Sequence, residues 1–210
     1  MQKKVLVADD HGAIRNGLKN ILQQQYPDLK FGECKNAQQT IKKLHDERWD
    51  LLILDIEMPG RNGFDVLKQI QSDHLKTPVL VFSFHSEDQV AVRAFRAGAA
   101  GYLAKDAEDL EIVSAVDQIL AGKKYITNSV AQSLASQIGF PTDKEPHELL
   151  SDREYQILRL ISSGKTVSEI SHELSLSTST ISTYRARILE KMSMKTNAEL
   201  TNYTIKKNLL

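Results

Sequence analysis

Short, uninterrupted apolar runs recur along the first 122 residues, and helical patterns lie between them. The three strongest runs occupy residues 5–8, 51–54 and 79–82, and weaker ones occupy residues 31–34 and 101–105. A continuous apolar run of this length is typical of a strand that is buried on both faces of a parallel sheet. Because strands and helices alternate strictly, we expect an α/β domain with a five-stranded parallel sheet and helices on both of its faces.

Five helical segments are expected between and after these strands, because apolar residues recur there at intervals of three and four. Asn36 is placed to cap the second helix. The fourth helix, over about residues 87–96, should end at Gly98, since glycine readily adopts the left-handed conformation of a helix C-cap. The fifth helix is expected over residues 109–121.

The last part of the chain, residues 148–210, has helical periodicity only, and we expect a separate all-α domain of four helices. Three of its helix starts carry Ser or Thr followed three residues later by Glu, at Ser151, Thr166 and Thr196. In such a capping box the hydroxyl and the carboxylate each satisfy a backbone amide that the helix start leaves unpaired. Ser177 is placed to cap a further helix. That helix would turn one face to the core, formed by Ile181, Tyr184, Ile188 and Met192.

Residues 123–147 separate the two patterns and have weaker periodicity. A short helix fits residues 129–138, whereas residues 139–146 contain two prolines and a glycine among polar residues and are typical of a linker. We therefore expect one domain over residues 1–122, a linker with a short helix over 123–147, and a second domain over 148–210.

Composition adds little to this picture, because it is that of an ordinary globular protein. The chain has 210 residues, of which 41% are hydrophobic and 26% charged, which is enough for two domains of common size. Its 27 Lys and Arg balance its 27 Asp and Glu, so net charge alone indicates no polyanionic partner. An acidic site in one part can still be balanced by a basic face in another, and each part has to be read separately.

Cysteine usage and hydropathy indicate a cytoplasmic location. A single cysteine, Cys34, can form neither an internal disulfide nor a thiolate zinc site, which favours a reducing compartment. No segment reaches the roughly 18 consecutive apolar residues of a membrane span. The first residues lead directly into a strand, so we expect neither a signal peptide nor a membrane partner.

Polar side chains stand at the ends of four expected strands. Asp9 and Asp10 follow the first strand, Asp55 the third and Ser83 the fourth, and Lys105 ends the fifth. Parallel strands present their carboxyl ends at one edge of the sheet, where open α/β sheets bind ligands. Crowded carboxylates need compensating charge, and Mg²⁺ with oxygen ligands would supply it. With the serine and lysine as donors to a phosphoryl group, the set has what the formation of an aspartyl phosphate requires.

Each of these acids also has a purely structural interpretation, since a single Asp after a strand is usually a loop residue or a helix cap. The joint occurrence of acids, serine and lysine at four strand ends argues against it. The same residues carry a resemblance to a known family. Residues 1–122 resemble the receiver domain of bacterial two-component response regulators, through Asp9, Asp10, Asp55, Met58, Pro59, Gly60, Gly63, Ser83, Gly98, Gly101, Tyr102 and Lys105.

The resemblance implies a flavodoxin-like sheet of order 2-1-3-4-5, for which members of this same family are well-known examples. It also implies that Asp55 accepts phosphate from a sensor histidine kinase, and that Lys105 contacts the phosphoryl group. Ser83 and Tyr102 would form the switch pair. Mg²⁺ would be held by Asp10, Asp55 and the backbone carbonyl of Glu57, with Asp9 acting through water.

Three positions depart from the common receiver pattern. Gly12 stands where many relatives have proline, Glu57 adds a carboxylate at the rim of the site, and Phe84 is bulky where a small residue is usual. We hypothesise that Phe84 shields the acyl phosphate from water. The alternative interpretation is that Phe84 is a packed loop aromatic. Glu57 and Phe84 are expected to leave the chemistry intact and to influence the lifetime of the phosphoryl group.

The second domain has the pattern of a helix-turn-helix, because short helices over residues 166–174 and 178–192 are joined by a tight turn. Residues 178–195 contain four basic residues and one acidic residue, a net charge of +3. Small polar side chains near a helix start can approach base edges, and hydroxyl and arginine groups can bind phosphates. The face opposite the core carries Ser179, Ser182, Thr183, Ala186, Arg187 and Glu190. A basic helix alone is often only a solvated face, but within this turn it favours DNA binding.

Residues 150–154, 168–170 and 180–184 resemble the LuxR-type helix-turn-helix, and with the receiver they indicate the NarL/FixJ class of response regulators. The resemblance implies that the helix from Thr178 enters the major groove. Residues facing bases would be Ser182, Thr183 and Ala186, and residues supporting phosphate contacts would be Thr180, Arg187 and Lys191. Many relatives have lysine at position 182 and histidine at position 184, so this chain is expected to read a different sequence or to rely more on phosphates and DNA shape.

The sequence therefore predicts a phosphorylation-controlled transcription factor and not a dedicated enzyme. Phosphate on Asp55 would bias a two-state surface around the last strand and its flanking helices. Expected partners are a sensor histidine kinase, promoter DNA and a second copy of the chain, with RNA polymerase as a further candidate. The kinase, the signal, the promoter, the dimer face and the sign of regulation are not encoded in any pattern of the sequence.

Two rival functions belong to other classes. An aspartate-dependent phosphatase would use the same carboxylate nucleophile, but the chain shows no cap domain or additional general acid, and turnover of a small phosphate ester would favour it. In a protein-interaction module the helices of the second domain would bind no DNA. A salt-dependent DNA shift assay distinguishes such a module from a DNA-binding domain.

Overall fold

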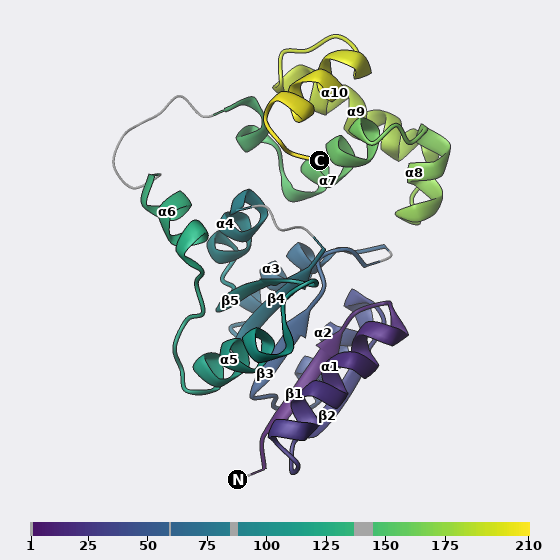
Figure 1. Ribbon diagram of the computed structural model, residues 1–210. Helices are drawn as coiled ribbons and strands as arrows, with labels where there is room; N and C mark the ends of the chain where they lie inside the picture. The colour runs from purple at the N-terminus through teal and green to yellow at the C-terminus, as the bar shows by residue number, and fades with distance from the viewer. Residues whose placement is uncertain (1, 59, 85–87, 137–144) are drawn as a thin grey trace. The chain divides into compact units, whose positions relative to one another are not determined.

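The structure is a computed structural model, and it describes residues 2–58, 60–84, 88–136 and 145–210 (Figure 1). Two compact units divide the chain, Met1–Ile138 and Gly139–Leu210. Pro59 of the receiver-like motif and residues 139–144 of the expected linker lie outside the described residues. Within the described residues no helix is long and apolar enough to cross a membrane.

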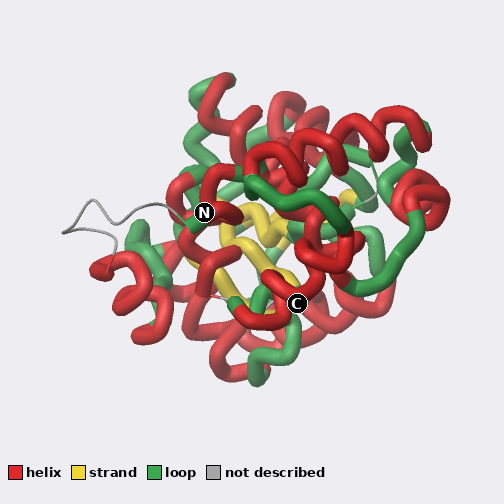
Figure 2. The backbone as a smooth tube through the Cα atoms, turned by 90° about the horizontal axis from the view of Figure 1, so that it is seen from above, coloured by secondary structure: helices red, strands yellow, loops and turns green. Residues whose placement is uncertain are grey.

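The first unit contains a parallel sheet with the strand order β2-β1-β3-β4-β5, as expected. Each apolar run of the sequence forms one strand. Figure 2 shows the neighbouring strands side by side in yellow. The bounds of the strands are Lys4–Ala8 for β1, Lys30–Cys34 for β2, Leu51–Leu54 for β3, Val79–Ser83 for β4 and Gly101–Ala104 for β5.

A helix follows each strand, so the predicted alternation is confirmed. Asn36 caps the second helix by accepting a hydrogen bond from the Gln39 amide, and Gly98 and Gly122 follow the fourth and fifth helices with positive φ of 93° and 79°. The helices are α1 (Gly12–Gln25), α2 (Ala37–Asp46), α3 (Gly63–Ser72), α4 (Asp88–Arg96) and α5 (Asp109–Leu120).

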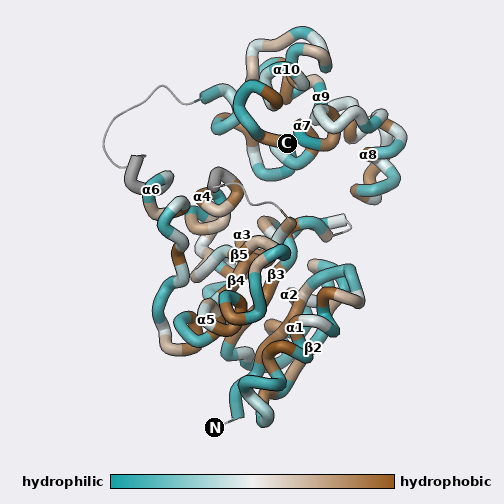
Figure 3. The backbone as a smooth tube through the Cα atoms, in the orientation of Figure 1, coloured by the Kyte–Doolittle hydropathy of each residue, from teal (hydrophilic) through white to brown (hydrophobic). Residues whose placement is uncertain are grey.

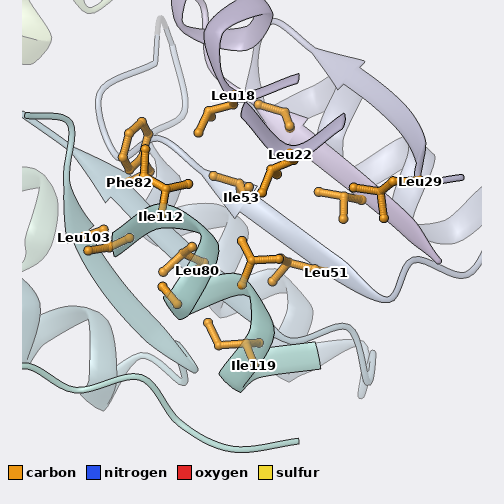
Figure 4. Packing of buried hydrophobic residues seen from close by; sticks show 14 residues of the cluster. Leu18, Leu22, Leu29, Leu51, Ile53, Leu80, Phe82, Leu103, Ile112 and Ile119 are labelled. Carbon is orange, nitrogen blue, oxygen red and sulfur yellow. The ribbon is translucent and has the colours of Figure 1, made fainter. Parts of the chain in front are cut away.

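The sheet is buried on both faces, which explains why its strands read as continuous apolar runs. On one face, alternate strand residues pack against α1 and α5. Figure 4 shows this cluster, in which side chains of α1, α5 and the strands point toward one another. Its labelled members include Leu22 of α1, Ile53 of β3, Leu80 of β4 and Ile119 of α5. Figure 3 shows the corresponding brown, hydrophobic colour along β3 and β4.

The other face of the sheet packs against α2, α3 and α4. Helices α2 and α3 lie against each other. At the β2 edge, Gly32 leaves room for the Trp49 ring, because a Cβ at Gly32 would lie 2.2 Å from Trp49 Cη2 and 2.9 Å from Leu6 Cδ1. The two helical layers hold the strand ends in register and so fix the edge at which the polar residues stand.

The segment after α5 belongs to the same unit. Tyr125 forms a parallel bridge with Gly101 at the open edge of β5, its amide donates to the Ala100 carbonyl at 2.9 Å, and its hydroxyl donates to Glu111 at 2.8 Å. Helix α6 (Asn128–Ser136), which corresponds to the expected short helix, packs against α4 and buries Val130. Residues 123–136 therefore cover part of the β5 edge and α4.

The second unit has the four helices expected from its periodicity, preceded by a 3₁₀ turn. The turn is η1 (Pro146–Leu149), and the helices are α7 (Asp152–Ser162), α8 (Val167–Glu173), α9 (Thr178–Lys191) and α10 (Asn197–Lys206). The turn is anchored by buried His147, whose Nδ1 lies 2.7 Å from the Tyr203 hydroxyl of α10. His147 falls in the range expected to be linker, but it packs as part of the helical unit.

The caps of these helices follow the sequence with one difference. Ser151 and Thr166 form complete capping boxes with Glu154 and Glu169, and Ser177 accepts from the Thr180 amide. Thr196 caps α10, but the Glu199 carboxylate accepts from the Lys195 amide at 2.7 Å instead of the Thr196 amide. The third capping box is thus incomplete, because the hydrogen bond to the glutamate comes from the amide one residue earlier in the chain.

Candidate functional site

Two nearly inaccessible carboxylates stand at the carboxyl edge of the sheet. Asp9 follows β1 and is 1% exposed, and Asp55 follows β3 and is 2% exposed. Backbone bonds fix both positions, because the Asp9 amide donates to the Cys34 carbonyl at 3.2 Å and the Asp55 amide donates to the Ala8 carbonyl at 2.8 Å. The parallel pairing of β1 and β3 therefore brings the two predicted acids together.

Lys105 lies between these carboxylates. Its Nζ is 2.7 Å from Asp9 Oδ2 and 2.8 Å from Asp55 Oδ2, and its side chain is inaccessible to solvent. Burial alone would lower the pKa of Lys105, but Asp55 and Asp9 outweigh it and raise the pKa, so the ammonium stays charged. One cation thus offsets two buried anions, and a net negative charge remains.

Burial raises the pKa of Asp55 to about 6, although Lys105 acts in the opposite direction. The Asp9 carboxylate also raises this pKa, and the Glu57 amide, which donates to Asp55 Oδ1 at 3.1 Å, lowers it. Near neutral pH the carboxylate is ionised yet poorly solvated, which is the state required of a nucleophilic oxygen.

The Ser83 hydroxyl is the fourth predicted group at this edge. Ser83 ends β4 and is fully buried, and within the described residues its Oγ has no hydrogen-bond partner. A buried hydroxyl without a partner is costly and indicates a group that is satisfied only when a ligand is present. The Lys105 amide donates to the Ser83 carbonyl at 2.8 Å, so β4 and β5 position Ser83 and Lys105 together.

The loop after Asp55 is held tightly against the start of α3. The Gly63 amide donates to the Ile56 carbonyl at 2.9 Å, and Asn62 and Asp65 form a complete capping box at the helix start. A Cβ at Gly63 would lie 2.4 Å from the Asp55 backbone oxygen, closer than any side chain can approach. Gly63, which matched the receiver pattern in the sequence, therefore permits the close contact that positions Asp55.

Tyr102 and Glu57 occupy different environments. Tyr102 lies in β5 with a side chain that is 5% exposed, whereas Glu57 is exposed at the rim of the site. The tyrosine is therefore buried, and the Glu57 side chain lies in solvent while its backbone amide contacts Asp55.

Two residues near the acids were missed by the sequence reasoning. Arg15 of α1 is almost buried, donates to the Asp9 carbonyl at 2.8 Å through Nη1 and pairs with Glu33 at 3.0 Å. His11 Nδ1 lies 2.9 Å from Asp10 Oδ1 and 3.3 Å from Asp9 Oδ1. Both residues follow the acidic pair closely in the sequence, but that spacing alone does not predict the direction of either side chain.

Phe84 follows Ser83 and partly closes the site. Its ring centroid lies 4.7 Å from Lys105 Nζ and 6.4 Å from the His11 ring, which meets it edge to face. The outer side of the ring is in solvent, and the side chain is 62% exposed. Phe84 is therefore not a packed loop aromatic, because it covers Lys105 from the solvent side.

The acidic residues fit a hard divalent cation. Asp9, Asp10, His11 and Asp55 each offer a ligand atom, and these atoms all lie within 4.8 Å of one another. Carboxylate oxygens are the ligands that Mg²⁺ prefers in proteins, usually one or two of them together with water and phosphate oxygens. The charge left over beside Lys105 favours the same ion.

The exposed face of α9 in the second unit carries the residues expected to reach DNA. Ile181, Ile188 and Met192 are buried as predicted. The expected contact residues are exposed, apart from half-buried Thr180, and comprise Thr178, Ser182, Thr183, Ala186, Arg187 and Lys191. Tyr184 differs from the expectation, because it is half-buried at the edge of the helix and lines a shallow groove with Ser179, Thr180, Thr183 and Arg187.

Hydrogen bonds orient two of these exposed side chains. The Ser182 hydroxyl donates to the Thr178 carbonyl at 2.9 Å, and the Thr183 hydroxyl donates to the Ser179 carbonyl at 3.0 Å. In this orientation the oxygens present lone pairs outward, and these can accept from the amino groups of adenine or cytosine.

Glu154 ties α9 to α7. Its Oε2 accepts from the Ser151 amide at 2.7 Å and from Lys191 Nζ at 2.6 Å. Burial opposes ionisation of Glu154, but the bonds from Lys191 and Ser151 outweigh it and lower its pKa. Lys191, expected at phosphates, is thus engaged with a buried carboxylate while its side chain remains 42% exposed.

Two family models match the chain. The model described as "Response regulator receiver domain" matches residues 5–117, and that described as "Bacterial regulatory proteins, luxR family" matches residues 148–204. The first match contains the acidic site and the second contains α7, α8 and α9.

Named relatives match nearly the whole chain. Response regulator UvrY of Escherichia coli K12 is 34% identical over 206 residues, which cover 98% of this chain and 94% of UvrY. Response regulator GacA of Pseudomonas syringae pv. syringae B728a is 34% identical over 208 residues, which cover 99% of this chain and 97% of GacA. A solved complex of the two-component response regulator RcsB with DNA superposes with a TM-score of 0.59 at 25% identity, covering 97% of this chain and 98% of that one.

Proposed function

The chain belongs to the two-component response regulators of the NarL class, and we propose on this basis that phosphorylation of Asp55 controls its binding to promoter DNA. It is a transcription regulator in which a receiver domain is joined to a LuxR-type DNA-binding domain. The observation that carries the proposal is the buried Asp55 carboxylate paired with Lys105 beside the unsatisfied Ser83 hydroxyl.

The phosphoryl group would come from a phosphohistidine of a sensor histidine kinase. An Asp55 carboxylate oxygen attacks phosphorus, the phosphorus–nitrogen bond breaks, and the released imidazole nitrogen takes up a proton. Lys105 and Ser83 then donate to phosphoryl oxygens, because both groups stand at the same strand edge as Asp55. Forming these bonds draws β4 and β5 toward the acyl phosphate, and Tyr102 of β5 responds as the switch residue.

Asp10, Asp55 and the backbone carbonyl of Glu57 would hold Mg²⁺, with Asp9 acting through water. When bound, the ion neutralises charge on the phosphoryl oxygens during transfer. The residues of the chain orient the nucleophile, limit access of water and keep Lys105 charged. No role as a dedicated enzyme is part of the proposal, and the location is the cytoplasm that the single cysteine indicates.

Phosphate incorporation tests the first half of the proposal. The full chain is incubated with Mg²⁺ and a small-molecule phosphodonor, and the acyl phosphate is detected by mass spectrometry. Asp55→Asn should abolish incorporation, whereas Asp28→Asn, at an exposed loop position, should leave it unchanged. Incorporation that persists at the same site in Asp55→Asn refutes the assignment.

The second half of the proposal concerns promoter DNA. The helix α9 would enter the major groove with Ser182, Thr183 and Ala186 toward the bases. Thr178, Thr180, Arg187 and Lys191 would support contacts to phosphates. Its basic character and its exposed, outward-facing hydroxyl oxygens support this role. A second copy of the chain would occupy the other half of a two-fold site, and RNA polymerase would be met at the promoter.

A salt series separates DNA binding from protein interaction. Affinity for genomic fragments recovered by the phosphorylated chain should fall as salt rises, because counterions are released from the phosphates. Arg187→Ala should weaken binding by roughly tenfold and reduce the salt slope by about one contact. Salt-independent retention, or equal retention by Arg187→Ala, would point to a protein-interaction module.

A further inference from the structure

The His11 side chain is aimed at the acidic cluster and has no role in the helix that it begins. His11 is the N-cap residue of α1, but its side chain makes no capping hydrogen bond. Its backbone amide instead donates to Asp9 Oδ1 at 2.7 Å, and its Nδ1 lies 2.9 Å from Asp10 Oδ1. The chain therefore turns at His11 so that an imidazole nitrogen and two carboxylates converge.

The position of this ring is fixed from its outer side. The Phe84 ring meets it edge to face at 6.4 Å and belongs to the same site through its contact with Lys105 Nζ at 4.7 Å. Such aromatic contacts have a preferred geometry and restrict the rotation of both rings. The imidazole Nδ1 thus faces the acids, whereas other parts of the ring remain in solvent, and 57% of the side chain is accessible.

The spacing of the donors is that of neighbouring ligands on one ion. Metal–ligand bonds of about 2.1 Å at right angles place adjacent donor atoms roughly 3 Å apart. His11 Nδ1 and Asp10 Oδ1 are separated by 2.9 Å, and the four-residue group with Asp9 and Asp55 spans no more than 4.8 Å between ligand atoms. A bound ion distinguishes this arrangement from a simple ion pair between His11 and Asp10, which has the same distance.

We propose that His11 Nδ1 is a direct ligand of the divalent cation in this receiver, which makes the site a mixed nitrogen and oxygen site selective for transition-metal ions. The inference rests on the proposed function, because it adds a ligand to the site at which Asp55 is phosphorylated. Imidazole nitrogen binds borderline ions such as Co²⁺ and Ni²⁺ more strongly than it binds Mg²⁺, which prefers oxygen. Mn²⁺ is harder than Co²⁺ and Ni²⁺ and binds mainly through oxygen, but it also accepts an imidazole nitrogen as a ligand. Mg²⁺ would still bind through the carboxylates, whereas the transition ions gain an additional bond.

Pulsed electron paramagnetic resonance of the Mn²⁺-loaded full chain tests this directly, since it detects hyperfine coupling to a ligated ¹⁴N. The wild-type chain should show this coupling, and His11→Ala should lose it. His45→Ala is the matched control, because His45 also contacts a carboxylate, Asp73 at 3.0 Å, but away from the cluster. His45→Ala should keep the nitrogen signal.

Calorimetric titrations with Mg²⁺ and Co²⁺ provide the second measurement. His11→Ala should weaken Co²⁺ binding on the order of 10-fold and change Mg²⁺ binding by less than about twofold. A merely structural role of His11 would weaken both ions equally. Equal loss, or a wild-type Mn²⁺ spectrum without nitrogen coupling, overturns the inference.

A third variant separates this inference from the function on which it rests. Asp10→Asn should weaken binding of all three ions, because it removes a carboxylate from the cluster. If Asp10→Asn weakens them and the nitrogen coupling is absent, only the role of His11 fails. If Asp10→Asn changes the binding of none of them, the metal site of the proposed function fails together with it.

Discussion

At the scale of single residues, the candidate phosphoacceptor site concentrates like charges in a buried region. Asp9 and Asp55 are almost fully buried and share one counterion, Lys105. Among the described residues, two anions around one cation leave a net negative charge at this edge of the sheet. This negative charge lowers the free energy of unfolding, and either binding of a divalent cation or neutralisation of Asp55 can remove the effect.

The first prediction concerns stability without metal. The pKa of Asp55 is raised from 3.8 to about 6, so its contribution favours folding below pH 4 and is lost as the pH rises through about 6. At pH 7 in EDTA, Asp55→Asn should therefore raise the free energy of unfolding by about 1–3 kcal/mol. Lys105 keeps Asp9 as a partner in this variant.

Chemical denaturation across pH checks this sign. The difference between Asp55→Asn and wild type should shrink as the pH falls from 7 toward 4. Excess Mg²⁺ should stabilise the wild type more than the variant, because only the wild type offers all three carboxylates. An Asp55→Asn chain that is less stable than wild type at pH 7 in EDTA contradicts the prediction.

The second prediction concerns Phe84, which covers Lys105 from the solvent side. Phe84→Ala should hasten loss of the acyl phosphate, because water gains access to the phosphorus. A barrier lower by about 1 kcal/mol corresponds to a rate roughly fivefold higher. Phe84→Leu should restore part of the lifetime, since it covers the site without an aromatic ring. An unchanged dephosphorylation rate in Phe84→Ala would mean that the ring does not shield the site.

The acids could be located from the sequence, but their surroundings could not. Asp9, Asp55, Ser83 and Lys105 were predictable as neighbours, because parallel strands place their carboxyl ends at one edge. The bond from Arg15 to the Asp9 carbonyl and the direction of the His11 ring depend on how the start of α1 packs. No local pattern specifies such packing, so these two residues emerged only from the structure.

At the scale of elements, the contact between β3 and the start of α3 decides where Asp55 stands. The Asn62–Asp65 capping box fixes the first turn of α3, and Gly63 allows that turn to touch the Asp55 backbone. Both features lie in the loop that follows Asp55, so the start of α3 and the position of Asp55 depend on each other.

Gly63→Ala provides the third prediction. The added Cβ would lie 2.4 Å from the Asp55 oxygen and 2.9 Å from Ile56 Cα, and both atoms belong to the backbone. We expect a loss of about 2 kcal/mol in unfolding free energy together with slower phosphorylation of Asp55. Gly17→Ala in α1 is the control, because among the described residues no atom outside the neighbouring helix backbone lies within 4 Å of an added Cβ. This variant should stabilise the chain by about 0.5–1 kcal/mol. Normal stability and normal phosphorylation in Gly63→Ala would contradict the role given to this contact.

Elements were predicted more reliably than the orientation of single side chains at their edges. Every strand and helix expected in the first 122 residues is present, because the periods of the apolar residues differ clearly between the two structures. Tyr184 was expected in the core but lies half-buried on the groove of α9. It follows Ile181 by three residues, which places it at the border of the buried face, where periodicity alone does not decide.

At the scale of the whole molecule, each unit has its own core, and each concentrates charge of one sign in one place. The chain is neutral in total, yet the first unit gathers acids at the sheet edge and residues 178–195 carry a net charge of +3. The boundary expected at residue 122 stays a prediction, but residues 123–136 pack on α4 and β5 within the first unit.

The fourth prediction tests this packing. Val130 of α6 is 4% exposed, and burying an unpaired charge there is strongly unfavourable. Val130→Asp should detach α6 and speed hydrogen exchange of the amides in α4 and α6 by at least about tenfold, with little change in α7–α10. Gln132→Asp, on the exposed side of the same helix, should leave exchange unchanged. Equal protection of α4 in both variants would show that α6 does not support it.

The bridge between Tyr125 and Gly101 has a consequence for the exchange of modules between proteins. Recombination that joins this receiver to a foreign output domain directly after Gly122 would remove a strand-edge partner and the helix on α4. A junction within residues 137–144 would transfer the receiver with these supports intact. Hybrid regulators built at the second junction should therefore yield far more folded protein than those built at the first, and gene fusions retained in nature should be subject to the same constraint.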